Sequence, residues 1–221
     1  MSPEILNLIW QATLDTLSMV AVATAIGTLV GLPLGVFLAT SKRGELFAAS
    51  ALNAALGVVV NATRSTPFII LVVAIIPFTR LIAGTSIGTA AAIVPLTVAC
   101  IPFIARLIEG AIREVDQGLV EAARAMGATP VQIVRKVLVP EALPAIVLGL
   151  TLAVVSLIGF SAMVGAVGGG GLGDLGIRYG YQRFMPDVMA TVVAVLIVLV
   201  QLVQSFGDRL ARRLNKRLRH A

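Results

Sequence analysis

The stretch "MVAVATAIGTLVGLPLGVFLA", residues 19–39, decides the fold because it contains no charged side chain over 21 residues. An α-helix rises about 1.5 Å per residue, so about 20 apolar residues cross the roughly 30 Å hydrocarbon core of a bilayer. The whole chain shares this character: of its 221 residues, 58% are hydrophobic and 13% are charged. Soluble domains carry about 25% charged residues. The sequence therefore predicts an integral membrane protein.

The chain contains five apolar segments long enough to span a bilayer. The predicted spans cover about 16–39, 48–78, 87–112, 142–167 and 188–206. The second is interrupted by Arg64-Ser65-Thr66-Pro67, and the proline indicates a local break in the helix. The predicted fold class is an all-α polytopic membrane protein with five transmembrane helices.

Lysine and arginine are distributed unequally between the two sides of these spans. The larger group has twelve of the 17 basic residues: Lys42, Arg43, Arg113, Arg124, Arg135, Lys136, Arg209, Arg212, Arg213, Lys216, Arg217 and Arg219; the smaller has Arg80, Arg178 and Arg183. Cytoplasmic loops collect Lys and Arg. We therefore expect an extracytoplasmic segment at 1–15, a transmembrane domain at 16–206 with a cytoplasmic loop at 113–141, and a basic cytoplasmic tail at 207–221.

The remaining composition excludes several function classes. The net charge of +6 does not indicate nucleic-acid binding, because the basic residues flank apolar spans and do not form a soluble basic face. Cys100 is the only cysteine and His220 the only histidine. The sequence therefore offers almost no side chains that could bind zinc or act as a catalytic histidine. We expect no catalytic residue, metal site or cofactor in this chain.

Three glycines in the first span, Gly27, Gly31 and Gly35, recur at four-residue spacing. This spacing places them on one helix face, where small residues let two helix backbones approach closely. They indicate a packing seam, within one protomer or between two. The alternative is the general enrichment of glycine in membrane helices.

The cytoplasmic loop contains the segment "EAARAMGATPVQIVRKVLVP", residues 121–140, which predicts two short helices and a turn. Asp116 is a candidate cap for the first helix, and Gly127 allows a break after it. Thr129 and Gln132 form a predicted capping box for the second, with Pro130 at its first position. The apolar stripe of this second helix is Ile133, Val134, Val137 and Leu138.

This segment resembles the "EAA" loop of binding-protein-dependent ABC importer permeases, whose pattern is E-A-A-x3-G-x9-I-x-L-P. Glu121, Ala122, Ala123, Gly127 and Pro140 match that pattern. Val137 and Val139 depart from it conservatively, where isoleucine and leucine are usual. The resemblance implies that a short coupling helix docks on an ATPase; its residues here are Glu121, Ala122, Ala123, Arg124, Ala125, Met126 and Gly127. The alternative is that this segment is an amphipathic helix at the membrane interface, without a partner protein.

The resemblance extends over nearly the whole chain. "RSTPFIIL" at 64–71 is similar to amino-acid ABC permeases, and "IPFTRLIAGTSIG", "AAIVPLTV" and "GFSAMVGAVGGGGLG" resemble permeases of methionine importers in particular. The family implies a type I importer in the bacterial inner membrane. Its parts would be two copies of this subunit, two ATP-binding ATPase subunits and an extracytoplasmic substrate-binding (lipo)protein. The implied cargo is an amino acid, with methionine (L, D or both) favoured.

Several polar or small residues inside the spans are candidates for the translocation pathway. Arg64 lies where a charge is costly, so it should face protein or water, either for transport or to satisfy carbonyls of a broken helix. Ser161, Met163 and Gly165 could line a narrow path, with Met163 as a plug, or pack helices closely. Arg106 and Glu109 are three residues apart and predict an ion pair on one helix face.

The stretch "AVGGGGLGDLG", residues 166–176, matches G-x-G-x-x-G by spacing. A dinucleotide site would need a strand before these glycines and a soluble helix after them, whereas membrane spans flank them here. We interpret them as a glycine-rich exit from the fourth span. By resemblance, Arg178, Tyr181 and Arg183 beyond it are candidate contacts for the binding protein.

Two other function classes compete with an ATP-driven importer. An ion-gradient-driven secondary amino-acid transporter should show intramembrane carboxylates or matched broken helices, and the sequence indicates neither. A membrane-embedded enzyme would need a nucleophile, base or metal cluster. The single cysteine, Cys100, lies in an apolar run, and the single histidine, His220, lies in the tail, so neither is a good candidate for such a site. The prediction is therefore a non-catalytic permease subunit.

Overall fold

The structure is a computed structural model that describes residues 3–42, 46–47 and 49–215. Within these ranges the chain is helical, with no strand. The elements in chain order are α1 (Pro3–Thr40), α2 (Ser50–Ser65), α3 (Phe68–Ala74), α4 (Ile76–Ala83), α5 (Thr89–Arg113), α6 (Gln117–Ala125), α7 (Pro130–Ile133), the π-helical turn η1 (Val134–Leu138), α8 (Val139–Ala166), α9 (Gly171–Leu175), the π-helical turn η2 (Gly176–Tyr181) and α10 (Pro186–Leu214).

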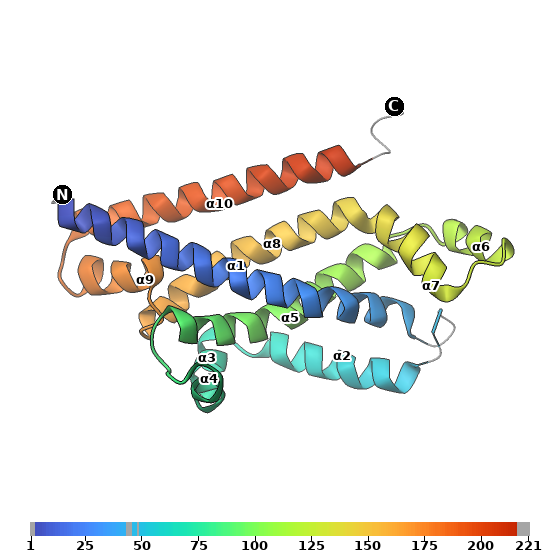
Figure 1. Ribbon diagram of the computed structural model, residues 1–221, viewed down its shortest axis with the longest axis horizontal. Coiled ribbons are helices and arrows are strands. Elements are labelled where there is room, and N and C mark those ends of the chain that lie inside the picture. The colour runs from blue at the N-terminus through green and yellow to red at the C-terminus, as the bar shows by residue number, and fades with distance from the viewer. Residues whose placement is uncertain (1–2, 43–45, 48, 216–221) are drawn as a thin grey trace.

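The long helices lie side by side and give the molecule an elongated shape (Figure 1). Helix α1 begins at one end of the long axis, and α10 begins near that end and runs toward the other (Figure 1). Helices α6 and α7 lie at the end where the chain finishes, and α9 lies at the end where it starts. Residues 216–221 of the predicted basic tail lie outside the described residues.

Four helical segments are long and apolar enough to cross a membrane: α1, α5, the continuous segment Pro130–Ala166, and α10. A fifth span is formed if α2 and α3, which meet at a bend of 104°, count as one. The predicted span 48–78 is therefore divided at Ser65–Pro67, where a proline stands in the predicted polar run. The all-α fold with five candidate spans agrees with the sequence prediction.

The core is formed where α1, α5 and α8 meet. Met19, Leu96, Ile104, Ile108 and Leu157 are fully buried there. Many large apolar side chains remain exposed on the outside, including Leu29 at 77% and Leu202 at 62%. An apolar exterior of this extent is unstable in water and is what a lipid-facing surface requires.

The three glycines of α1 form a seam against α5. A methyl group at Gly31 would come within 2.9 Å of the Ile101 carbonyl oxygen, and one at Gly35 within 2.5 Å of the Ala105 carbonyl oxygen. A methyl group at Gly27 would collide with Cys100 Sγ. The seam lies within one protomer, which decides between the alternatives left open by the spacing.

Candidate coupling site and translocation surface

Both ends of α6 are fixed by backbone-directed hydrogen bonds. The Asp116 carboxylate accepts a hydrogen bond of 2.8 Å from the Gly118 N–H. At the other end Gly127 has φ 77°, its N–H donates to the Arg124 carbonyl, and the Ala128 N–H donates to the Ala123 carbonyl. These two bonds make a Schellman motif, which needs a left-handed residue at this position and so favours glycine. The predicted cap and the predicted turn are both confirmed.

The predicted capping box after the turn is also present. The Thr129 hydroxyl accepts from the Gln132 N–H, and the Gln132 side chain accepts from the Thr129 N–H at 2.9 Å. Ile133 and Leu138 are buried and Val134 and Val137 are half-buried, so the apolar stripe holds this helix against the bundle. The turn that joins α6 to α7 is therefore fixed by hydrogen bonds on both of its sides.

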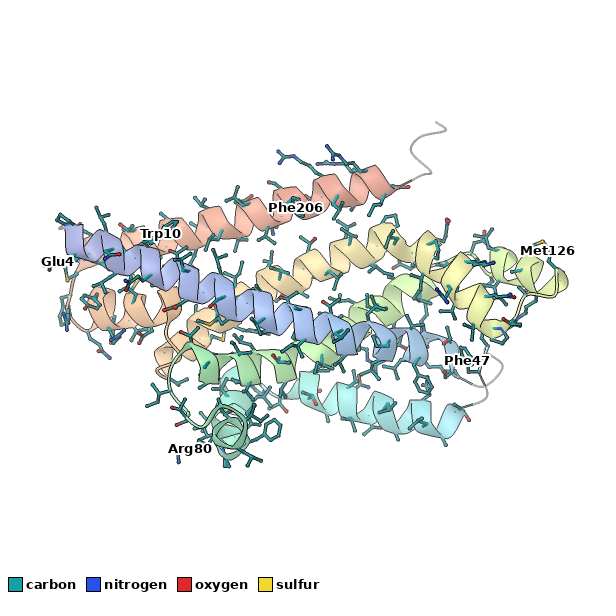
Figure 2. The ribbon with its side chains drawn as sticks, in the orientation of Figure 1. Glu4, Trp10, Phe47, Arg80, Met126 and Phe206 are labelled. Atoms are coloured by element: carbon teal, nitrogen blue, oxygen red, sulfur yellow. The ribbon has the colours of Figure 1, made fainter. Side chains whose placement is uncertain are left out.

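The two faces of α6 differ in what they contact. Val120 and Ala123 are buried in the main core cluster. Leu119 is 41% exposed, Met126 is 81% exposed, and Ala122 lies between them on the same outer face. Figure 2 places Met126 at the far tip of this end of the molecule. Of the two alanines of the predicted coupling helix, Ala122 is exposed and Ala123 packs inward, because it lies one position from Ala122, about 100° around the helix.

One face of α8 is exposed and uncharged over most of its length. Leu148, Leu152, Gly159 and Met163 recur on it at intervals of four or seven residues, and the Met163 side chain is 47% exposed. Ser161 is 2% exposed and its hydroxyl donates to the Ile158 carbonyl at 2.7 Å. A methyl group at Gly165 would lie 2.7 Å from the Gly173 carbonyl carbon. Met163 is thus exposed on this face, whereas Ser161 and Gly165 face neighbours in the same protomer and do not line an open surface.

The break between α2 and α3 exposes Arg64 and anchors the following helix. Arg64 is exposed, and the described residues offer it no hydrogen bond or ion pair. The predicted structural role, satisfying carbonyls of the broken helix, therefore finds no contact within this protomer. Phe68 of α3 stacks on Phe160 of α8 with ring centroids 4.4 Å apart, which fixes α3 near Met163.

The glycine-rich segment after α8 is a tight packing junction. Gly168, Gly170 and Gly171 have φ between 73° and 86°, a region that favours glycine. The Gly88 N–H donates to the Gly168 carbonyl at 2.8 Å, and the Leu172 N–H donates to the Thr16 hydroxyl at 2.9 Å. These bonds join the loop to α5 and α1, and no strand precedes it among the described residues, so the dinucleotide interpretation stays rejected.

The three residues beyond this junction lie on η2 and the turn after it. Arg178 pairs with Asp174, and the Arg183 guanidinium lies 4.3 Å from the centre of the Tyr179 ring. Tyr181 is 68% exposed. They form a polar and aromatic surface that directly follows α9, which lies at the end of the molecule opposite α6 (Figure 1).

The chain matches the family model described as "Binding-protein-dependent transport system inner membrane component" over residues 31–220. The chain belongs to this family. It is a multi-pass inner-membrane component of a transport system.

Named relatives and a solved structure cover nearly the same length. A probable D-methionine transport system permease protein MetI of Vibrio cholerae is 59% identical over 211 residues, covering 96% of this chain and 94% of that protein. The D-methionine transport system permease protein MetI of Escherichia coli K12 is 52% identical over 165 residues, covering 75% of this chain and 76% of that protein. A chain from inward-facing conformations of the MetNI methionine ABC transporter has a TM-score of 0.95 at 50% identity, covering 98% of this chain and 100% of that chain.

In this inner-membrane component the predicted Arg106–Glu109 ion pair is present, but sequence reasoning missed its other partners. Arg106 Nη2 also donates to Asn61 Oδ1 at 2.8 Å, and Arg113 Nη2 donates to Glu109 Oε1 at 2.9 Å. The seven-residue interval from Arg106 to Arg113 is about two helical turns, so the sequence alone could have predicted that both arginines lie on the same helix face. The contact with Asn61 joins residues 45 positions apart, so no local sequence pattern could have predicted it.

Among the described residues, no group of three or more His, Cys, Asp or Glu side chains is placed to hold a metal ion. Cys100 is a buried free cysteine against the glycine seam. His220 lies outside the described residues.

Proposed function

We propose that this chain is the permease subunit of an ATP-driven, binding-protein-dependent importer whose cargo is methionine. The observation that carries the proposal is the likeness over the whole chain to a MetNI methionine ABC transporter chain, at 50% identity and a TM-score of 0.95. The relatives named D-methionine permeases support the same cargo and leave both stereoisomers as candidates. The same likenesses favour ATP over an ion gradient as the energy source.

The outer face of α6 is the proposed contact for the ATPase. Leu119, Ala122 and Met126 present an exposed apolar strip, with the charged side chains of Glu121 and Arg124 exposed beside it. An amphipathic helix whose apolar face lies outside its own protomer fits a groove of a soluble partner. The chain itself would then be non-catalytic and hold no cofactor, because ATP binds to the separate subunit.

Two copies of the chain are needed for the proposed machine. Each chain presents one α6, whereas an ABC motor has two ATPase subunits, so each ATPase would receive one coupling helix from a homodimer. The uncharged exposed face of α8 supports this arrangement, since it offers a second copy a surface that avoids buried charge. The translocation pathway would run between the two copies.

Met163 and Arg64 are the proposed pathway residues. Both are exposed in the single protomer, and Phe68 and Phe160 lie between the elements that carry them. Ser161 and Gly165 support this region by packing. Normal methionine uptake by both Arg64→Ala and Arg64→Lys would remove Arg64 from the proposal.

The surface containing Arg178, Tyr181 and Arg183 is the proposed contact for the binding protein. It follows α9, which lies at the opposite end from α6, and the excess of Lys and Arg on the α6 side supports a cytoplasmic location for that side. The binding protein would then dock on the extracytoplasmic side, and α1 would begin there.

The test is uptake of labelled methionine by proteoliposomes that contain the chain, its ATPase and its binding protein. We expect uptake to need ATP and to persist when proton and sodium gradients are collapsed. L- and D-methionine offered separately assign the stereoisomer, with leucine as a control cargo. Uptake driven by a gradient without ATP, or a chain that never co-purifies with an ATPase, would overturn the proposal.

A further inference from the structure

Helix α2 is held to the rest of the protomer by few apolar contacts. Only Asn53 and Val60 are buried among its sixteen residues. Val60 packs with Leu38 and Ala105 in a small cluster separate from the main core. A helix with so little buried apolar surface gains little free energy from its position, so its polar contacts decide where it sits.

Two of these polar contacts come from one guanidinium on α5. Arg106 Nη2 donates to the Gly57 carbonyl at 3.2 Å and to Asn61 Oδ1 at 2.8 Å. Its other terminal nitrogen, Nη1, pairs with Glu109. The guanidinium therefore binds one turn of α2 through Nη2 and the Glu109 carboxylate of its own helix through Nη1.

Glu109 fixes the direction of that guanidinium. Its side chain is 7% exposed and accepts from Arg106 on one oxygen and from Arg113 on the other, at 2.9 Å. A carboxylate this deeply buried needs such partners, because an unpaired charge there is costly. Arg113 Nη2 also donates to the Leu38 carbonyl at 3.4 Å, an oxygen that accepts from Asn53 Nδ2 at 2.9 Å as well. Arg106, Glu109 and Arg113 therefore form one ladder along α5 that contacts both α2 and the end of α1.

The C-terminal end of this ladder, at Arg113, leads directly into the proposed coupling helix α6. Arg113 is the last residue of α5, and α6 begins after its cap, Asp116. Val115, Val120 and Ala123 are buried in the same core cluster as Ile108 and Ile112 of α5. The end of α5 and α6 are thus packed as one unit, so a displacement of α6 moves the arginines of the ladder.

The C-terminal end of α2, at Ser65, leads to the proposed pathway. The break at Ser65–Pro67 connects α2 to α3, and Phe68 stacks on Phe160, one helical turn before Met163. We propose that Arg106, oriented by Glu109, is a positioning residue that transmits movement of α6 to α2 and so to the pathway. This inference rests on the proposed function, since it assumes that an ATPase moves α6.

A lysine cannot replace Arg106 in this role. The guanidinium presents its donors in a fixed planar fork, so it can bind Glu109 and α2 at the same time, whereas an ammonium is a single point on a flexible stem. Arg106→Lys keeps the positive charge beside Glu109 and loses the fixed link to α2. Asn61→Ala removes one acceptor on exposed α2 and leaves the charges untouched.

The experiment measures methionine imported per ATP hydrolysed, with the complete complex in proteoliposomes. We expect Arg106→Lys to assemble and to hydrolyse ATP as the parent does, while the ratio falls by about tenfold, within the range of typical coupling effects. Asn61→Ala should lower the ratio in the same direction by a smaller factor. Arg209→Lys is the matched control, because Arg209 is exposed and the described residues give it no hydrogen bond or ion pair.

An unchanged ratio in Arg106→Lys overturns the inference. So does a parallel loss of hydrolysis and uptake at constant ratio in an assembled complex, which would indicate a purely structural role. If Arg106→Lys fails to assemble, Asn61→Ala decides, and an unchanged ratio there overturns the inference too. Failure of the proposed function itself is separate, because it would appear as a parent complex without ATP-dependent uptake.

Discussion

A methionine side chain is long, unbranched and able to rotate about three bonds, and Met163 places such a side chain on the uncharged exposed face of α8. Its neighbours on that face are either aliphatic or glycine, so no other side chain there combines length with flexibility. Because the face is proposed to meet a second copy, two Met163 side chains would approach each other across the pathway. That arrangement suits a plug that opens by rotamer changes.

At the scale of this residue we predict that Met163→Ala makes the closed pathway leaky. The shorter side chain should raise efflux of preloaded methionine, or raise ATP hydrolysis in the absence of binding protein, by several fold. Both are measured in the same proteoliposomes. Leu152→Ala is the matched control, because Leu152 is 51% exposed on the same face and is three turns away from Met163. Unchanged efflux and hydrolysis in Met163→Ala would count against the plug.

The residue scale also separates what the sequence could predict from what it could not. The Arg106–Glu109 pair was predictable because both residues lie on one helix face three positions apart. Its link to Asn61 was not, because it depends on how α2 packs against α5. Ser161 and Gly165 were ambiguous for the same reason: a small residue in a span suits a pathway and a packing contact equally, and only burial in the structure distinguishes them.

At the scale of elements, the α1–α5 seam is a close helix contact that rests on three small residues. Backbone carbonyl oxygens of α5 lie where side chains of α1 would otherwise be. In lipid, where helix association depends on packing more than on the hydrophobic effect, such close approach supplies much of the attraction. The seam therefore sets the position of α5, and with it the ladder and α6.

We predict that Gly35→Ala destabilises the protein, because its methyl group would lie 2.5 Å from the Ala105 carbonyl oxygen. Overpacking of this kind costs about 1–3 kcal/mol. The measurement is the thermal unfolding midpoint of the purified protein in detergent, which should fall. Gly110→Ala is the control, since its methyl group would meet no atom within 4 Å and should leave the midpoint equal or higher. Equal midpoints for both variants would contradict the seam.

Elements with local signals were predicted well, and elements set by tertiary packing were not. The caps at Asp116 and Thr129 depend on residue types at fixed offsets, so the sequence determined them. The polar run at 64–67 indicated a break, but its 104° bend and the separate helix α4 depend on contacts with α5 and α8. The direction in which α6 turns Ala123 inward likewise depends on the core beneath it.

At the scale of the whole molecule, the fold separates two surfaces along one axis. Helix α6 lies at one end and α9 at the other (Figure 1), and the surface of Arg178, Tyr181 and Arg183 directly follows α9. The long helices α1, α5, α8 and α10 connect the two ends. A membrane protein with this polarity can bind a different partner on each side, and a change at one end can reach the other through packed helices.

The last prediction tests the outer surface by charge. Arg178→Glu combined with Arg183→Glu should weaken binding of the binding protein to the solubilised complex by about tenfold or more, because like charges across an interface cost several kcal/mol when the partner surface is acidic. Arg178→Lys with Arg183→Lys keeps both charges and should retain most of the affinity. The affinity of the parent should also fall as salt is raised, since exposed charges are screened. ATP hydrolysis without binding protein serves as the internal control and should stay unchanged, because α6 lies at the opposite end. Unaltered complex formation by the charge-reversed variant would assign the docking surface elsewhere.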